Sequence, residues 1–480
     1  MTLRPIALAL ALAMLTAGCA VGPDFQRPAA PAVSGYVPPG TQAPRDTRYV
    51  AGADVPADWW RSFKSPALDA LVEKALAANP NIEAARAALR GAQETAAAQR
   101  GVFWPQVSAS VTPTRQKIAD IQSSALASNA TLYSLHTGQL NVGYTADVFG
   151  GNRRAVESLE AQAEFQQFEL QAARVSLAAN VAAAAIQEAS LRGQIAADER
   201  MAKLQADMLG IARRQFELGA IAEAGVATQE TALAQTRAAL PPLRKQLAQT
   251  RDLLVALTGG FPDQDLPQTF DLDHLELPHE LPLSLPSRLV EQRPDVRAAE
   301  AQAHAAAAQV GVAFANMLPQ FTVDASIGSV ATRMGDLFKA GTGFWSIAGA
   351  VAQPLFAGGA LGHRKAAAEA GYDQALAQYR ATVIAAFQNM ADTLHALDQD
   401  AEALDAADAA LAAANRSLRI ARRQAELGDI SHLALLSAEQ AWQQAAGAQV
   451  QARASRYADT VALFQALGGG WWNGEAAAKR

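Results

Sequence analysis

The feature that most constrains this chain is an internal duplication. The nine residues Ile211–Gly219 (IARRQFELG) recur as Ile420–Gly428 (IARRQAELG), an offset of 209 residues between positions 219 and 428. Farther along, Leu257–Gly260 recurs near the same offset as Leu467–Gly470. Similarity at a fixed period indicates one structural unit that is repeated. Chance likeness between two alanine-rich helices is the alternative, but it does not explain the shared string.

Proline and glycine residues are repeated in the same order. In both copies a proline opens an alanine-rich stretch, a Pro-Gln pair opens an alternating run, and a Gly-Gly pair follows the second run: Pro80 and Pro294, Pro105-Gln106 and Pro319-Gln320, Gly150-Gly151 and Gly358-Gly359. Each half therefore predicts a helix, two strands, a very long helix, a tight turn and a return helix.

Composition narrows the class of protein. Hydrophobic residues make up 50% of the 480 residues but aromatic residues only 6%, so alanine and leucine supply most of the apolar content. Both are strong helix formers, which predicts a helix-rich fold. A net charge of -6 with interspersed signs gives no footprint for nucleic acid, and a charged content of 18% argues against disorder as the main state.

The residues of a known catalytic or metal site are missing from the sequence. The single cysteine excludes a disulfide framework and a cysteine-based zinc cluster. The seven histidines are scattered without metal-ligand spacing, and no phosphate-loop, nucleophile-elbow or zinc-protease motif occurs. The sequence therefore predicts a protein that is not an enzyme and that holds no cofactor and no metal.

Residues 1–18 are interpreted as an export signal peptide, because Arg4 precedes an apolar run, Ile6–Leu15, that is too short to span a bilayer. The run ends in Leu15–Cys19 (LTAGC), which resembles a bacterial lipobox. We therefore expect Cys19 to be acylated; a cysteine buried at the end of a helix is the alternative. The residue after the cysteine is Ala20. An aspartate there would favour retention of the lipoprotein before the outer membrane, so alanine indicates delivery to the outer membrane. Residues 19–65, rich in proline and glycine, predict an extended leader with no core of its own.

Four alternating runs predict strands, near residues 103–113, 138–149, 319–331 and 343–356. In the second run Leu140, Val142 and Tyr144 share one face, and polar residues occupy the other. This pattern fits a half-buried strand of a soluble sandwich or a strand of a membrane barrel. Runs of about ten residues suit a tilted membrane span.

Four strands cannot close a barrel, and open edges in hydrocarbon would leave backbone groups unpaired. If the strands lie in a membrane, several copies must share one barrel. A dimer would give eight strands and a packed interior, whereas a trimer would give twelve strands and room for a pore.

The long helices are predicted over 152–218 and 362–427, about 100 Å each at 1.5 Å per residue. Two of the shorter partners, over 66–100 and 224–257, have about half that length, so two short helices laid end to end match one long helix. Pro241-Pro242 is expected to kink or break the first return helix, because proline removes a hydrogen bond and clashes with the preceding turn.

These features resemble the outer membrane factors of the TolC/OprM type, and most closely their NodT lipoprotein branch. The resemblance covers nearly the whole mature chain and is carried by Cys19–Phe25, Val148–Gly150, Gln353–Gly359 and the two Glu-Leu-Gly turns. It implies a mainly α protein with a membrane β-barrel, which is a homotrimer with twelve strands and a periplasmic α-helical barrel. Repeats over 66–260 and 287–470 would be joined by an equatorial linker, 261–286, and followed by a tail, 471–480.

The resemblance also implies a function. Such a protein is the exit duct of a tripartite pump that exports small molecules, joined to a periplasmic adaptor and an inner-membrane transporter of the resistance-nodulation-division kind. It would be anchored by lipid in the outer membrane and extend into the periplasm. Two alternatives stay open: the duct of a type I protein secretion system, and a periplasmic lipoprotein of helical hairpins without a barrel.

By the same resemblance, the two Leu-Gly turns form a periplasmic tip that opens like an iris. The expected gate residues are Leu427, Asp429, Ala434 and Ser437. Ala434 and Ser437 stand six and nine positions past Gly428, where some relatives carry acidic residues, so a double ring of aspartates is not expected. The alternative for Asp429 is an ordinary solvated turn residue. The expected adaptor contacts are Leu218, Gly219, Ala220, Leu427 and Gly428.

Overall fold

The computed structural model describes residues 20–33, 35–37, 48–122, 128–427 and 429–478. The signal peptide expected over 1–18, Cys19 and Gly428 lie outside these residues. Two compact units form: a sheet unit of residues 1–28, 88–166 and 299–379, and a helical unit of residues 29–87, 167–298 and 380–480. Each unit therefore combines matching parts of both sequence repeats. Among the described residues, no helix has an apolar stretch long enough to cross a membrane.

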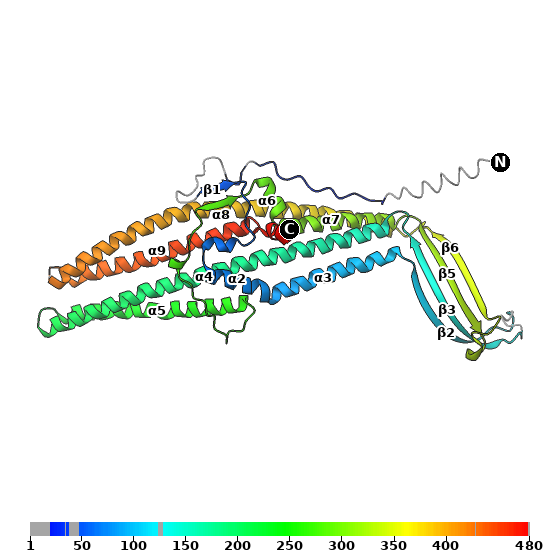
Figure 1. The fold of residues 1–480 in the computed structure, drawn as a ribbon, viewed down its shortest axis with the longest axis horizontal. Coiled ribbons are helices and arrows are strands. Elements are labelled where there is room, and N and C mark those ends of the chain that lie inside the picture. The colour runs from blue at the N-terminus through cyan, green and yellow to red at the C-terminus, as the bar shows by residue number, and fades with distance from the viewer. Residues whose placement is uncertain (1–19, 34, 38–47, 123–127, 428, 479–480) are drawn as a thin grey trace. The chain divides into compact units, whose positions relative to one another are not determined.

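The order of elements shows the duplicated plan (Figure 1). The first copy comprises α2 (Pro66–Ala78), α3 (Pro80–Arg100), β2 (Gln106–Lys117), β3 (Leu132–Ala146), α4 (Gly151–Glu217) and α5 (Glu223–Leu257). The second comprises α6 (Pro286–Gln292), α7 (Pro294–Ala315), β5 (Gln320–Ala331), β6 (Gly343–Ala352), α8 (Ala360–Leu427) and α9 (His432–Ala466). Outside the copies lie β1 (Arg48–Ala51), β4 (Glu280–Leu283), α10 (Trp471–Ala478) and the short 3₁₀ turns η1 (Trp59–Phe63) and η3 (Leu272–His274). Two further 3₁₀ turns lie inside the copies: η2 (Gly101–Phe103) between α3 and β2, and η4 (Met334–Asp336) between β5 and β6.

The single helix expected over 66–100 is in fact two helices, α2 and α3, separated at Asn79. Proline restricts the residue before it to extended backbone, and Asn79 has φ -69° and ψ 125° ahead of Pro80. The Asn79 side chain then accepts a hydrogen bond from the backbone nitrogen of Asn81 (2.9 Å) at the start of α3. Arg293 before Pro294 separates α6 and α7 in the same way.

The expected break at Pro241-Pro242 is wrong, because α5 continues through both prolines to Leu257. Buried side chains lie on both sides of the pair: Leu233 and Leu240 before it and Leu254 after it. Tertiary packing on this scale can override a local helix penalty of about 3 kcal/mol. The two long helices have 67 and 68 residues, and α5 and α9 have 35 each, which agrees with the two-to-one length ratio expected for the return helices.

The sheet unit contains one antiparallel sheet in the order β2-β3-β5-β6. Its strand bounds differ from those expected at several ends. β2 continues past Pro113 to Lys117, and β3 begins at Leu132 and stops at Ala146. β6 stops at Ala352, two residues before Pro354, which has no amide hydrogen to donate.

The leader, expected to be extended and without a core of its own, contributes its last residues to the core of the helical unit. Trp59 and Phe63 are buried in the core of the helical unit. The Trp59 ring stacks on Phe464 of α9 with centroids 5.1 Å apart. Upstream, β1 pairs in parallel with β4 of the 261–286 linker. Large aromatic side chains are worth several kcal/mol when buried, so two tryptophans and a phenylalanine outweigh the proline-rich composition around them.

Candidate functional site

The sheet presents two chemically distinct faces. Rows of apolar side chains run across the four strands, for example Ala109–Leu140–Ile327–Trp345 in register. Many of these side chains are exposed, including Val107, Val111, Leu140, Ile327, Trp345, Ile347 and Val351. An exposed apolar face of this extent marks a contact with lipid or with another protein.

The opposite face is polar and hydrogen-bonded. The Asn141 amide donates to the Ser110 hydroxyl (3.5 Å) and accepts from the Gln139 amide (2.9 Å). The hydroxyls of Ser326 and Ser346, which are paired in register, lie 2.8 Å apart. One face of the sheet therefore suits hydrocarbon and the other suits water.

The sheet has two open edges. Within the described residues β2 pairs only with β3, and β6 pairs only with β5. The outward backbone groups of both strands lack a partner strand, a condition that soluble proteins avoid in long strands. The sheet is thus incomplete as a structure surrounded by lipid.

The first part of the leader is held in the sheet unit by a buried arginine. Arg154 of α4 is 4% exposed, donates to the carbonyl of Val21 (3.1 Å) and pairs with Asp24 and Glu157. Gly22 has φ +97°, and a Cβ there would lie 2.4 Å from Cα of Gly311. Phe25 stacks on His304 at 4.8 Å. These contacts explain the Gly-Pro-Asp-Phe segment of the leader.

The first hairpin turn contains Leu218, Gly219 and Ala220. Gly219 has φ +73°, as expected for the residue that ends a helix. The amide of Ala220 donates to the carbonyl of Gln215 (2.8 Å), and that of Gly219 donates to Phe216 (2.8 Å). Leu218 is 78% exposed, so its side chain is available to a partner.

The second turn repeats this geometry, because the amide of Asp429 donates to the carbonyl of Gln424 (2.8 Å). These two residues stand 209 positions after Ala220 and Gln215. Leu427, the last residue of α8, is 59% exposed, and Asp429, Ala434 and Ser437 are also exposed. Ser431 caps α9 by accepting from the amide of Ala434 (3.3 Å). The four expected gate residues therefore share one turn and the first two turns of α9.

Below the turns, the long helices and α9 share a small apolar core. Met208 of α4, Leu418 and Ala421 of α8, and Leu435 and Ala438 of α9 pack together. The core joins the two hairpins within the helical unit. Any separation of the hairpins at the tip must open it.

A buried carboxyl group lies at this level, and the sequence reading missed it. Glu439 of α9 is 0% exposed, and within the described residues neither carboxylate oxygen has a hydrogen bond of full geometry, although two side-chain amides lie near it. Around it lie Gln205 of α4, Gln229 of α5 and Arg422 of α8. Burial raises the pKa of Glu439, and the two amides and the guanidinium oppose the shift. Glu439 is the only glutamate of α9 and stands four residues past the buried Leu435, so a period of 3.6 residues was the signal that could have found it.

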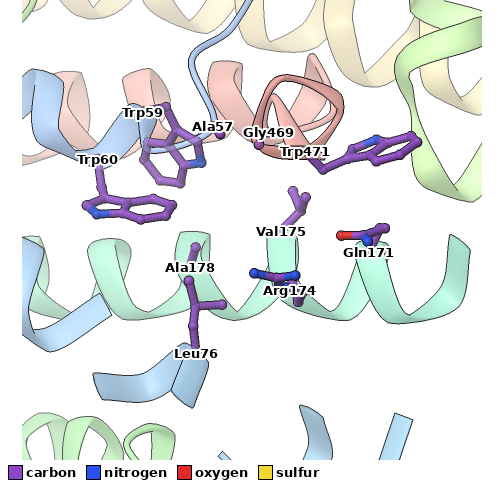
Figure 2. A pocket seen from close by; sticks show the side chains of 11 residues that line it. Ala57, Trp59, Trp60, Leu76, Gln171, Arg174, Val175, Ala178, Gly469 and Trp471 are labelled. Carbon is purple, nitrogen blue, oxygen red and sulfur yellow. The ribbon is translucent and has the colours of Figure 1, made fainter. Parts of the chain in front are cut away.

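The linker expected over 261–286 packs on helices of the helical unit, and we call this contact region the belt. The linker carbonyl of Leu275 accepts from the Tyr457 hydroxyl, and Arg251 of α5 pairs with Glu188 of α4 (2.9 Å) and with Asp265 of the linker. The leader and the C-terminal segment meet α4 around a cavity of about 310 Å³. Figure 2 shows Trp59, Trp60, Val175, Ala178 and Trp471 around it.

The C-terminal segment packs on this belt through Trp471. Its indole nitrogen donates to the carbonyl of Gln292 (2.8 Å), and its ring meets Phe168 edge-on. Gly470 has φ +69°, and a Cβ there would lie 2.4 Å from the carbonyl oxygen of Val55. The Gly-Gly-Gly run thus permits a close approach between the second half of the leader and the C-terminal segment.

Comparison with known proteins agrees with this architecture. The chain is 29% identical over 462 residues to a toluene efflux pump outer membrane protein, TtgC of Pseudomonas putida, covering 96% of this chain and 94% of the relative. It is 30% identical over 453 residues to the pyoverdine export outer membrane protein OpmQ of Pseudomonas aeruginosa, covering 90% and 92%.

Solved structures share the fold. The outer-membrane channel OprN superimposes with a TM-score of 0.84 at 26% identity, covering 94% of this chain and all of that one. The outer membrane protein VceC of Vibrio cholerae gives 0.80 at 27% identity, covering 86% and 99%. The expected fold class, mainly helical with a four-stranded sheet in a duplicated plan, is confirmed.

A family model described as outer membrane efflux protein matches residues 71–260 and again 285–469, one match for each copy of the duplicated plan. The chain therefore belongs to the outer membrane efflux protein family, and it is the outer membrane channel component of an efflux pump.

Proposed function

We propose that three copies of this chain assemble into one duct whose membrane part is a barrel of twelve strands. The observation that carries the proposal is the four-stranded sheet with two open edges, an exposed apolar face and a hydrogen-bonded polar face. Pairing β2 of one copy with β6 of the next satisfies every edge. Three sheets give twelve strands, which leave a pore, whereas eight would be filled by side chains.

In this assembly the apolar face meets lipid and the polar face lines the pore. Long helices of about 100 Å, α4 and α8, continue the duct into the periplasm, and their turns form its closed end. Leu427 and Asp429 narrow the aperture, with Ala434 and Ser437 just above it. The adaptor contacts the exposed turn residues Leu218, Gly219, Ala220 and Leu427, together with Gly428, which lies outside the described residues. An inner-membrane transporter of the resistance-nodulation-division kind supplies the substrate.

The substrates we propose are small molecules. Relatives named for toluene, antibiotic and pyoverdine export support this class over polypeptides. A duct for type I protein secretion is the second candidate, since it would use the same architecture. The chain itself performs no catalysis in either case.

Cys19 is proposed to carry lipid. The leader places Ala20 against Gly150, at the start of α4 and close to the end of β3, where a Cβ at Gly150 would lie 2.6 Å from Cα of Ala20. Ala20, the residue after the expected acylation site, therefore lies close to the sheet that would lie in the membrane. Mass spectrometry of the mature N-terminus tests this, and an unmodified Cys19 contradicts it.

The trimer is tested by native mass spectrometry of the protein in mild detergent. A mass of three chains is expected, and a monomer or dimer contradicts the shared barrel. The substrate class is tested separately, by deleting the gene and measuring the minimal inhibitory concentrations of apolar toxic compounds alongside the secreted proteins of the culture. Loss of a secreted protein with no change in tolerance would favour the secretion duct.

A further inference from the structure

Positive charge on the sheet is confined to one end. In β2, β3, β5 and β6 the only lysine and arginine residues are Arg115 and Lys117, at the end of β2 farthest from α3. Strand alternation puts both on the same face as Val107 and Val111. The loop between β5 and β6, residues 332–342, adds Arg333 and Lys339, and all four cations are exposed.

The same loop folds back over the apolar face. Leu337 is 2% exposed, and a Cβ at Gly138 of β3 would lie 3.1 Å from its Cδ2. The Thr342 hydroxyl is within 2.8 Å of the carbonyls of Leu337 and Lys339 and fixes the shape of the loop. Asp336 is the only acidic residue of the loop, and it pairs with Lys339 at 2.6 Å. It therefore offsets only part of the positive charge of the four cations.

Between the loop and the strands lies a shallow groove of about 660 Å³. Apolar side chains dominate its lining, among them Val111, Leu140, Ile327, Phe338 and Trp345. It is open along one side, which suits a flexible chain better than a compact ligand. An apolar groove beside clustered cations matches an amphiphile with an anionic head.

The distance along β2 from its apolar residues to its cations agrees with the thickness of a bilayer. From Val107 to Lys117 the strand advances about 33 Å at 3.3 Å per residue, which is about 25 Å of height at a tilt near 40°. That height equals the apolar band of outer-membrane barrels. The cations therefore lie where hydrocarbon meets the headgroups, at the end of the sheet opposite α3 and the start of α4.

We propose that this groove binds an acyl chain of a phosphorylated glycolipid of the outer leaflet, and that Arg115, Lys117, Arg333 and Lys339 bind its phosphate groups. Arginine offers a planar fork that matches two phosphate oxygens, and lysine adds a point charge. The inference rests on the proposed function, because it takes the apolar face of the sheet as the lipid-facing one.

The test is native mass spectrometry of the purified full-length protein mixed with bis-phosphorylated lipid A, monophosphorylated lipid A or phosphatidylglycerol. Wild-type protein should retain the bis-phosphorylated probe most strongly. The triple variant Arg115→Gln, Lys117→Gln, Lys339→Gln should retain it at least fivefold less. The control variant Arg364→Gln, Arg380→Gln removes exposed charges of α8 and should bind as wild type does.

A second variant tests the groove. Phe338→Ser removes an exposed apolar wall and should weaken retention of lipid A without changing the cations. Millimolar inorganic phosphate should not displace the probe, because the acyl chain provides part of the binding. Displacement by phosphate would reduce the site to a simple anion site and overturn the proposal.

Equal retention of all three lipids, or unchanged retention by the triple variant, also overturns it. If the triple variant does not fold, raising the salt concentration on wild-type protein replaces it: 0.5 M NaCl should release the bis-phosphorylated probe selectively. Single-channel conductance of the same variants separates the two proposals. Normal conductance without lipid selectivity refutes the glycolipid site alone, whereas absent conductance in wild type refutes the duct.

Discussion

The two copies of the hairpin place the same arginine and glutamate in different environments. Arg213 of α4 and Glu230 of α5 form a pair at 2.7 Å, with side chains 59% and 48% exposed. The residues 209 positions later are Arg422 of α8 and Glu439 of α9. There the carboxyl is fully buried, and the contact with Arg422 is electrostatic without a hydrogen bond in the described residues.

The duplication therefore preserved the two residue types but not the free energy that their interaction contributes to stability. An exposed pair contributes about 0–1 kcal/mol because water screens both charges. A buried carboxyl must lose its hydration, and amide groups and a guanidinium nearby compensate only in part. The first pair is therefore a surface feature, and the second is a sensitive point where the two hairpins meet.

The largest effect is expected from removing the half-buried arginine near this carboxyl group. Arg422→Ala leaves Glu439 without its positive neighbour and should reduce the stability of the α8–α9 hairpin by about 3 kcal/mol. Hydrogen exchange of the α9 amides measures the loss of protection. The matched Arg213→Ala should change α5 protection by about 0.5 kcal/mol or less. Similar losses in both hairpins would show that burial does not distinguish the pairs.

Neutralising the buried acid should have the opposite sign. Because burial raises the pKa of Glu439 in the folded state, its favourable contribution is complete below the ordinary glutamate value and is lost as the pH rises through the raised pKa. Glu439→Gln should therefore stabilise the hairpin at pH 8 by about 1 kcal/mol and have little effect at pH 5. Urea unfolding followed across this range tests it. Glu230→Gln is the control, and an equal pH dependence in both variants would contradict the comparison.

The two turns should differ in their effect on the closed duct. Leu427→Ser removes an exposed apolar side chain at the proposed aperture and should raise closed-state conductance several-fold, on the order of 1 kcal/mol. Leu218→Ser, at the matching position of the first turn, should leave it unchanged. Planar-bilayer recordings of single channels give both values. Leakage from the Leu218 variant alone would place the aperture at the other turn.

The smallest effect concerns charge at the second turn. Asp429→Ala should weaken block by divalent cations about two- to threefold without opening the channel, because exposed carboxylates interact weakly through water. Ala220→Asp creates the same residue at the matching position of the first turn and should not add a second blocking site. Unchanged cation block in the Asp429 variant would mean that Asp429 is an ordinary solvated turn residue.

Much of this molecule could be derived from the sequence. The shared IARRQ-x-ELG string predicted the repeat, and alternation of apolar and polar residues predicted four strands with two different faces. Both are local patterns, fixed by the periods of helix and strand. The left-handed conformation of Gly219 also follows from local rules, because glycine alone has no Cβ to clash.

Other features depended on contacts between distant segments. The sequence did not distinguish Glu439 from Glu230, since only the packing of four helices makes one buried and the other exposed. The sequence pattern also assigned Trp59 and Phe63 to an extended leader, and it predicted a kink or break of the return helix at Pro241-Pro242. Local composition predicts both, but burial against α9 and the neighbouring helices overrides it. The sequence by itself determined the plan, and tertiary structure alone decided which charges and aromatic rings lost their water, because hydration is removed by neighbours far away in the chain.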